Sequence, residues 1–167
     1  MRWFSIYRSF YTNVPLEESL DIVEYRLRDD TPFSERTSLP LEGVMELLRC
    51  CRHNSYFQVK DKFYAQDDGL PMDSLLSSVI ANLYMEWFKT HAINTATIKP
   101  EIWLRYVDDT FIIWNETDRQ LDSFLNHLNS LRQTIKFTIE KEKNDCLSFL
   151  DVFDTKNNGQ IKTSLYM

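Results

Sequence analysis

Residues 102–114 of this 167-residue chain read IWLRYVDDTFIIW. Two apolar and aromatic runs flank the polar pair Asp108-Asp109, which is typical of a β-hairpin that carries its carboxylates at the tip. Adjacent carboxylates repel each other, and a divalent cation relieves the repulsion because hard cations prefer carboxylate oxygens. An ordinary turn also explains the pair, since aspartate tolerates turn geometry. The hairpin therefore predicts either a cation site or a plain turn.

The composition is that of a globular chain. Hydrophobic residues make up 43% and aromatic residues 14% of the sequence, and the length suits one domain with a sizeable core. The formal net charge of −6 does not favour a general attraction to nucleic acid, for which a basic patch is expected. If the chain binds a nucleic acid, we expect a further segment or a partner to supply most of the phosphate contacts.

The three cysteines are Cys50, Cys51 and Cys146, which form no disulfide framework and fit a reducing compartment. The segment Cys50-Cys51-Arg52-His53 has no second ligand pair at zinc spacing, so we expect it to be the end of a packed helix. The sequence contains no apolar run of about 18 residues, so we expect no membrane span. The start of the chain lacks the features of a secretory signal, and no other targeting signal is seen.

Apolar periodicity predicts both helices and strands. Steps of three and four residues predict helices over 16–29, 41–51, 73–88 and 117–131. Alternation and turn signals predict the hairpin at 102–114 and strands over 56–59, 63–66, 135–139, 147–153 and 160–166. Residues 3–11 are expected to form a strand or an irregular extended segment. The segments 30–40 and 91–99 are expected to be loops. Together these elements predict an α+β fold, an antiparallel sheet with helices packed on one face.

Three motifs in this order resemble the palm of reverse transcriptases: Phe-Tyr-Thr-Asn-Val-Pro at 10–15, Gly-Leu-Pro-Met at 69–72 and Tyr-Val-Asp-Asp at 106–109. With Leu-Ser-Phe-Leu-Asp-Val at 147–152, their spacing is similar to that of Penelope-like retroelements. The resemblance covers most of the chain, from about Ser9 to Tyr166. It implies a polymerase palm fold, with residues 1–167 forming one palm domain that is truncated at both ends and lacks complete fingers and thumb.

The resemblance implies RNA-directed DNA synthesis, a nucleotidyl transfer that uses two Mg²⁺ or Mn²⁺ ions about 3.5–4 Å apart. Asp108 is then a catalytic metal ligand, and Asp109 is a weaker or accessory one. The implied partners are an RNA template, a DNA primer, deoxynucleoside triphosphates, and the fingers and thumb segments of a longer polypeptide. The implied location is intracellular, and nuclear if the chain functions.

Nucleotide-binding residues are also implied by the resemblance. Tyr11 matches the aromatic residue that excludes a sugar 2′-hydroxyl, and a core aromatic is the alternative. The loop that shapes the nucleotide and template site corresponds to Gly69, Leu70, Pro71 and Met72, where glycine and proline permit a close backbone approach. Lys141 or Lys143 is a candidate charge partner for the triphosphate, although most lysines on such turns are merely solvated.

The chain departs from the family pattern at several motif positions. The family's first metal-binding aspartate corresponds to Ile6, and the first carboxylate in the chain is Glu17, beyond the turn. Asp73 replaces a glycine, and Leu75 and Ser78 replace prolines. An incomplete carboxylate cluster weakens a metal pair, so we expect this chain alone not to polymerise. The alternatives are a catalytically inactive retroelement remnant and a palm-like nucleic-acid-binding module, which the acidic balance disfavours.

Overall fold

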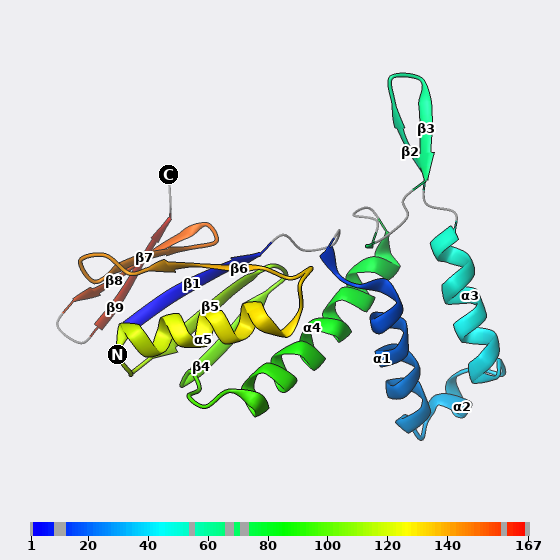
Figure 1. Ribbon diagram of the computed structural model, residues 1–167, viewed down its shortest axis with the longest axis horizontal. Helices are drawn as coiled ribbons and strands as arrows, with labels where there is room; N and C mark the ends of the chain where they lie inside the picture. Colours follow the sequence, from blue (N-terminus) through cyan, green and yellow to red (C-terminus); the bar gives the residue numbers. More distant parts are fainter. Residues whose placement is uncertain are drawn as a thin grey trace. The chain divides into compact units, whose positions relative to one another are not determined.

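The computed structural model describes residues 2–8, 13–53, 56–65, 69–70, 74–157 and 160–165. It combines helices with small antiparallel sheets (Figure 1), so the predicted α+β class is confirmed. The helices are α1 (Leu16–Asp29), α2 (Phe33–Arg36), α3 (Leu41–His53), α4 (Leu75–Thr95) and α5 (Asp118–Leu131). The strands are β1 (Arg2–Arg8), β2 (Tyr56–Val59), β3 (Lys62–Ala65), β4 (Ile102–Tyr106), β5 (Asp109–Trp114), β6 (Phe137–Lys141), β7 (Cys146–Phe149), β8 (Val152–Asn157) and β9 (Gln160–Leu165).

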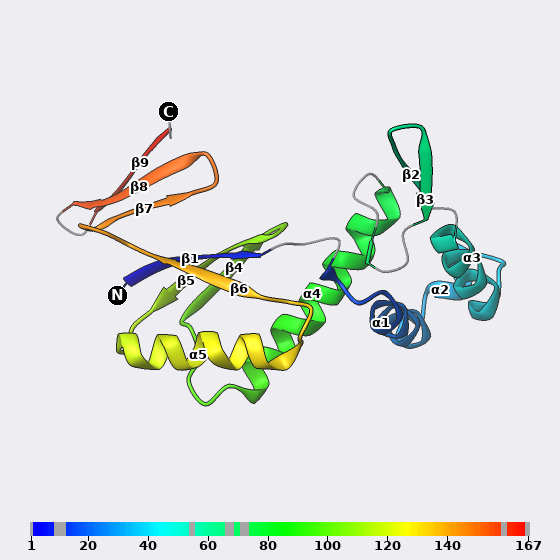
Figure 2. The ribbon, with the colours of Figure 1, turned by 45° about the horizontal axis from the view of Figure 1, so that its top comes forward.

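The chain forms two compact units, and the first comprises residues 1–10 and 91–167. Its main sheet is antiparallel, with the strand order β4-β5-β1-β6. Strand β1 is central, because Phe4 opposes Ile112 of β5 on one side and Lys141 of β6 on the other. Helix α5 lies along one face of this sheet (Figure 2), and β7-β8-β9 form a second, three-stranded sheet.

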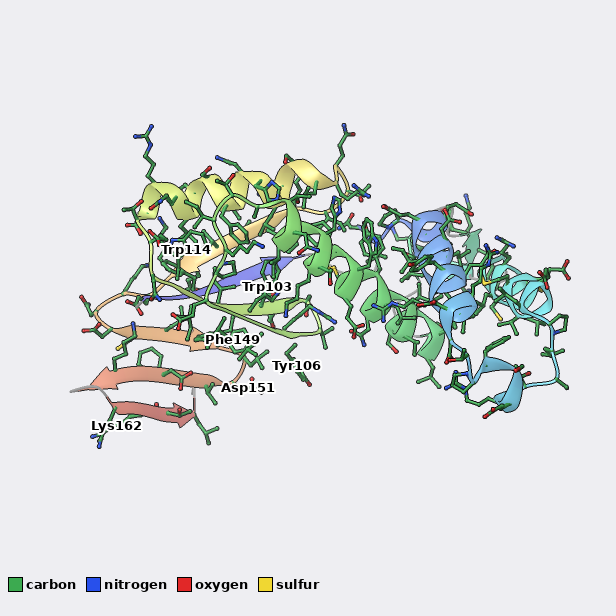
Figure 3. All side chains as sticks on the ribbon, turned by 90° about the horizontal axis from the view of Figure 1, so that it is seen from below. Trp103, Tyr106, Trp114, Phe149, Asp151 and Lys162 are labelled. Atoms are coloured by element: carbon green, nitrogen blue, oxygen red, sulfur yellow. The ribbon has the colours of Figure 1, made fainter. Side chains whose placement is uncertain are left out.

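The core of this unit lies between the main sheet and α5. Every second side chain of β5 is buried and the intervening ones are half-buried, as expected for a strand with one covered face. Phe124 of α5 packs against the rings of Trp114 and Trp103, at centroid distances of 5.3 and 5.9 Å. The two tryptophans are labelled in Figure 3. This packing fixes the register of β5, because a slip of one residue would turn Asp109 toward the core.

The second unit, residues 11–90, contains α1 to α3, the β2–β3 hairpin and most of α4. Of the apolar residues whose spacing predicts α1, Leu16, Leu20 and Val23 are buried and Leu27 is half-buried. Tyr84 of α4 is fully buried, and its hydroxyl donates a hydrogen bond of 3.2 Å to Glu18 of α1. A buried aromatic with a satisfied hydroxyl therefore joins the two helices.

Helix α4 is longer than predicted, because residues 91–95 continue it instead of forming a loop. Ala92 is fully buried, and the N–H of Ala96 donates to its carbonyl at 3.0 Å. The next helix-breaking residue is Pro100, so nothing in the sequence stops the helix at residue 90. Among the described residues, no helix has both the length and the apolar character needed to cross a membrane.

The prediction of one strand over 147–153 is wrong. Strand β7 ends at Phe149, the chain turns at Leu150 and Asp151, and β8 begins at Val152. Leu150 has a φ of 53°, a conformation for which leucine gives no sequence signal. Strand β6 is also shifted, to Phe137–Lys141 from the predicted 135–139. The pairing of Asn157 with Gln160 confirms the predicted hairpin between β8 and β9.

We expect Thr117→Ala to destabilise the first unit by about 1 kcal/mol, because it removes a helix cap. The Thr117 hydroxyl accepts from the Gln120 N–H, and the Thr117 N–H donates to Gln120 Oε1 at 3.0 Å. Urea denaturation followed by circular dichroism measures the loss. Thr117→Ser keeps the hydroxyl and should retain wild-type stability, so an equal loss in both variants would contradict the capping role.

Candidate functional site

The aspartate pair lies at the tip of the β4–β5 hairpin, as the sequence predicts. Tyr106 pairs with Asp109 across the two strands, so the connecting turn consists of Val107 and Asp108. Asp108 is exposed in the turn, whereas Asp109 is the first residue of β5 and is half-buried. The two carboxylates are therefore adjacent in sequence but differ in their contact with water.

The turn that holds the aspartates has an unfavourable backbone conformation. Val107 has a φ of 50°, and Asp108 is not among the residues with positive φ. This pattern matches a type II′ hairpin turn, which usually has glycine at its first central position. A β-branched residue there is strained, because its Cβ clashes with the neighbouring carbonyl.

Arg105 contacts this turn, and sequence reasoning does not identify it. Its Nη1 donates a hydrogen bond of 2.9 Å to the carbonyl oxygen of Val107. The only sequence signal is a charged residue within the otherwise apolar and aromatic strand IWLRY. A charge-assisted hydrogen bond helps to hold the strained turn in place, and with it the two carboxylates.

The carboxylates influence each other electrostatically. The pKa of Asp109 is raised above its usual value, first by burial of the carboxyl and second by the negative charge of Asp108. A cation bound between the two oxygens would counter both effects, because it stabilises the ionised form. Two adjacent carboxylates therefore suit one hard divalent cation.

The structure also locates position 6, which the resemblance to reverse transcriptases aligns with a metal-binding aspartate. Ile6 of β1 opposes Thr110, the residue that follows Asp109 in β5, and it opposes Ile139 of β6 on its other side. Position 6 therefore neighbours the aspartate hairpin across one pair of strands, but it supplies no carboxylate. Within the described ranges, no group of three His, Cys, Asp or Glu side chains is placed to hold a metal ion.

Comparison with solved structures finds a similar fold. An apo telomerase from Candida tropicalis, truncated from the C-terminal domain, matches with a TM-score of 0.69 at 13% sequence identity. The match covers 98% of this chain and 36% of that one, so the chain spans about a third of the length of the telomerase. At this identity the similarity is one of fold. No protein-family model matches the chain, and no curated protein matches it by sequence.

The predicted nucleotide-binding residues are only partly described. Gly69 has a φ of 77°, which glycine adopts freely, and both Gly69 and Leu70 are buried in the second unit. Tyr11, Pro71 and Met72 lie outside the described residues, as does Asp73. The roles that the resemblance implies for all of these residues remain predictions.

Lys141 has a partner on helix α5. Its Nζ lies 3.3 Å from Oδ1 of Asp122, in an ion pair whose side chains are 39% and 59% exposed. Asp109 alternates with the buried side chains of β5 and so lies on the sheet face away from α5. The ion pair directs the ammonium group toward the helix and competes with the predicted role of Lys141 at a triphosphate.

We expect Val107→Gly to stabilise the chain by about 0.5–1 kcal/mol, because relief of backbone strain exceeds the entropy that glycine adds to the unfolded state. Urea denaturation provides the measurement. Val59→Gly is the control, since Val59 is a valine that flanks a hairpin turn and does not have positive φ. That control should lose stability, and a loss in Val107→Gly as well would show that the turn is not strained.

Asp109→Asn should change how stability depends on pH when metal is chelated. Because the folded chain raises the pKa of Asp109, this group contributes most to stability below the ordinary carboxyl pKa. Its contribution falls as the pH rises through that value to the folded pKa. The variant should therefore be more stable than wild type at neutral pH and less dependent on pH between acid and neutral conditions.

Denaturation in urea with EDTA, at several pH values, checks this expectation. Asp108→Asn is the matched control: it removes the second cause of the shift and leaves the first, which is burial. Most of the pH dependence should therefore persist in the control. A wild-type chain whose stability rises with pH over this range, relative to Asp109→Asn, would contradict the assignment.

Proposed function

We propose that this chain is the palm portion of a reverse transcriptase of the Penelope-like retroelement type, and that it does not polymerise on its own. In a longer polypeptide, with fingers and thumb segments, its substrates are a DNA primer on an RNA template and deoxynucleoside triphosphates. The observation that carries the proposal is the hairpin with two adjacent carboxylates beside position 6 of β1.

The fold similarity supports the polymerase part of the proposal. Telomerase is a polymerase related to reverse transcriptases, and the match to it extends over 98% of this chain. The Tyr-Val-Asp-Asp motif at 106–109 falls at the hairpin tip, where an exposed and a half-buried carboxylate are available to a cation. The Penelope-like assignment rests on the motif spacing described above.

Nucleotidyl transfer with two metal ions needs more carboxylates than the hairpin supplies. When bound, the two divalent ions polarise the triphosphate and activate the 3′-hydroxyl of the primer. Asp108 and Asp109 are the residues that would hold Mg²⁺ or Mn²⁺, with Asp108 as the main ligand. Oxygen ligands from a second element are needed to complete a site for two ions, and Ile6 occupies the position from which the family supplies one.

We expect the 167-residue chain to show no primer extension on an RNA template with Mg²⁺ or Mn²⁺, because its carboxylate cluster is incomplete. The assay compares wild type with Asp108→Ala, incubated with labelled primer and all four deoxynucleotides. Extension by wild type that disappears in Asp108→Ala would contradict the proposed inactivity. Extension that persists in Asp108→Ala would identify a contaminating polymerase and leave wild type inactive, as we expect.

Metal affinity tests the same site without activity. Ile6→Asp should bind Mn²⁺ about tenfold more tightly than wild type, because a further charged ligand adds on the order of 1.4 kcal/mol. Isothermal titration calorimetry measures the affinity. Ile6→Asn has a polar but uncharged side chain and should bind as wild type does. Equal affinities in the aspartate and asparagine variants would show that position 6 does not belong to the metal site.

Restoration of activity completes the test. Ile6→Asp together with Asp73→Gly, in a longer polypeptide that supplies fingers and thumb, should permit extension that Asp108→Ala abolishes. A restored metal affinity with no extension would place the defect in the fingers, thumb or loop rather than in the carboxylates.

A further inference from the structure

A groove of about 580 Å³ lies between α1 and α4 within the second unit. On α1 its lining residues are spaced by three and four positions, so they form one face of the helix. They are Glu18, Asp21, Ile22, Tyr25 and Arg26, and Trp87 lines the groove from α4. The groove therefore combines carboxylates with aromatic and aliphatic surface.

The groove is polarised along α1. Glu18 and Asp21 lie at one end, and Glu18 is oriented by the hydrogen bond from the buried Tyr84 hydroxyl. At the other end Arg26 forms an ion pair with Glu86 of α4 at 3.3 Å, so its positive charge is balanced within the protein. Glu18 and Asp21 therefore place carboxylates at the end of the groove away from this ion pair.

Aromatic surface lies next to these carboxylates. Tyr25 is 71% exposed, so its ring is accessible from solvent. Trp87 is half-buried and packs beside Tyr84, with ring centroids 5.8 Å apart. Aromatic faces attract cations through their ring quadrupoles, and a nearby carboxylate adds a charge-assisted hydrogen bond.

The negative net charge of the second unit favours a positively charged partner. Residues 11–90 contain 14 acidic and 8 basic side chains, whereas the rest of the chain contains 11 of each. The whole formal charge of −6 therefore belongs to the unit that carries the groove. Such a surface repels nucleic acid phosphates and attracts a basic protein segment.

We propose that the α1–α4 groove docks a basic segment of a protein partner, with an arginine side chain seated between Trp87 and the carboxylates of Glu18 and Asp21. Arginine fits better than lysine because its planar guanidinium stacks on aromatic rings and binds a carboxylate through two parallel hydrogen bonds. The proposal does not rest on the polymerase function, since none of these residues belongs to the aspartate hairpin.

A pair of synthetic peptides tests the docking by isothermal titration calorimetry against the whole chain. One is a short acetylated peptide that repeats leucine, arginine and alanine, and the other replaces arginine with citrulline, its uncharged isostere. We expect saturable binding of the arginine peptide and about tenfold weaker binding of the citrulline peptide, because the charged hydrogen bonds are lost. Equal affinities would overturn the proposal.

Conservative variants of residues that line the groove locate the binding site. Asp21→Asn should weaken the arginine peptide about threefold, and Trp87→Leu, which keeps apolar bulk, should weaken it by about fivefold. Asp29→Asn is the matched control, since it removes an exposed acidic residue of the same helix outside the groove. Equal losses in Asp21→Asn and Asp29→Asn would indicate general charge attraction and overturn the proposal.

The same experiments distinguish a protein partner from two other occupants of the groove, a second copy of the chain and a single-stranded RNA. Sedimentation of the chain should show a monomer. A dimer that Trp87→Leu dissociates would assign the groove to a second copy and overturn the proposal. A single-stranded RNA oligonucleotide should not displace the arginine peptide, and competition between them would likewise contradict a protein partner.

Discussion

The main sheet depends on strand β1, because its backbone bonds to β5 along one edge and to β6 along the other. Without it the β4–β5 hairpin and β6 have no common partner in the sheet. Its Phe4 is buried, so the strand also contributes to the core. The same strand brings position 6 next to the aspartate hairpin, and the stability of the sheet and the candidate chemistry therefore meet in one element.

Isoleucine at position 6 illustrates how the stability of the sheet and the binding of metal favour different side chains. Isoleucine suits a strand better than aspartate does, because β-branched side chains pack well on a pleated surface. Position 6 also opposes Thr110, which is buried in the main sheet, so an unpaired carboxylate there would lose free energy on leaving water. Isoleucine at this position therefore favours the stability of the sheet.

Sequence reasoning succeeded where local patterns decide the structure. The spacing of leucines and valines predicted α1, and the predicted range 117–131 came within one residue of α5. It failed at Leu150, because a leucine with positive φ carries no turn signature, and at residues 91–95, where no breaker stops α4. The contact between Lys141 and Asp122 and the groove between α1 and α4 depend on tertiary placement, which periodicity does not encode.

The central position of β1 also affects how the chain folds while it is being synthesised. Phe4 precedes its partner Ile112 by 108 residues and its partner Lys141 by 137 residues. Ribosomes add roughly 5–20 residues per second, so both edges of β1 wait several seconds for their partners. Unpaired strand edges are templates for pairing with other chains. Strand β1 therefore stays open to pairing with other chains for longer than any later strand of the main sheet.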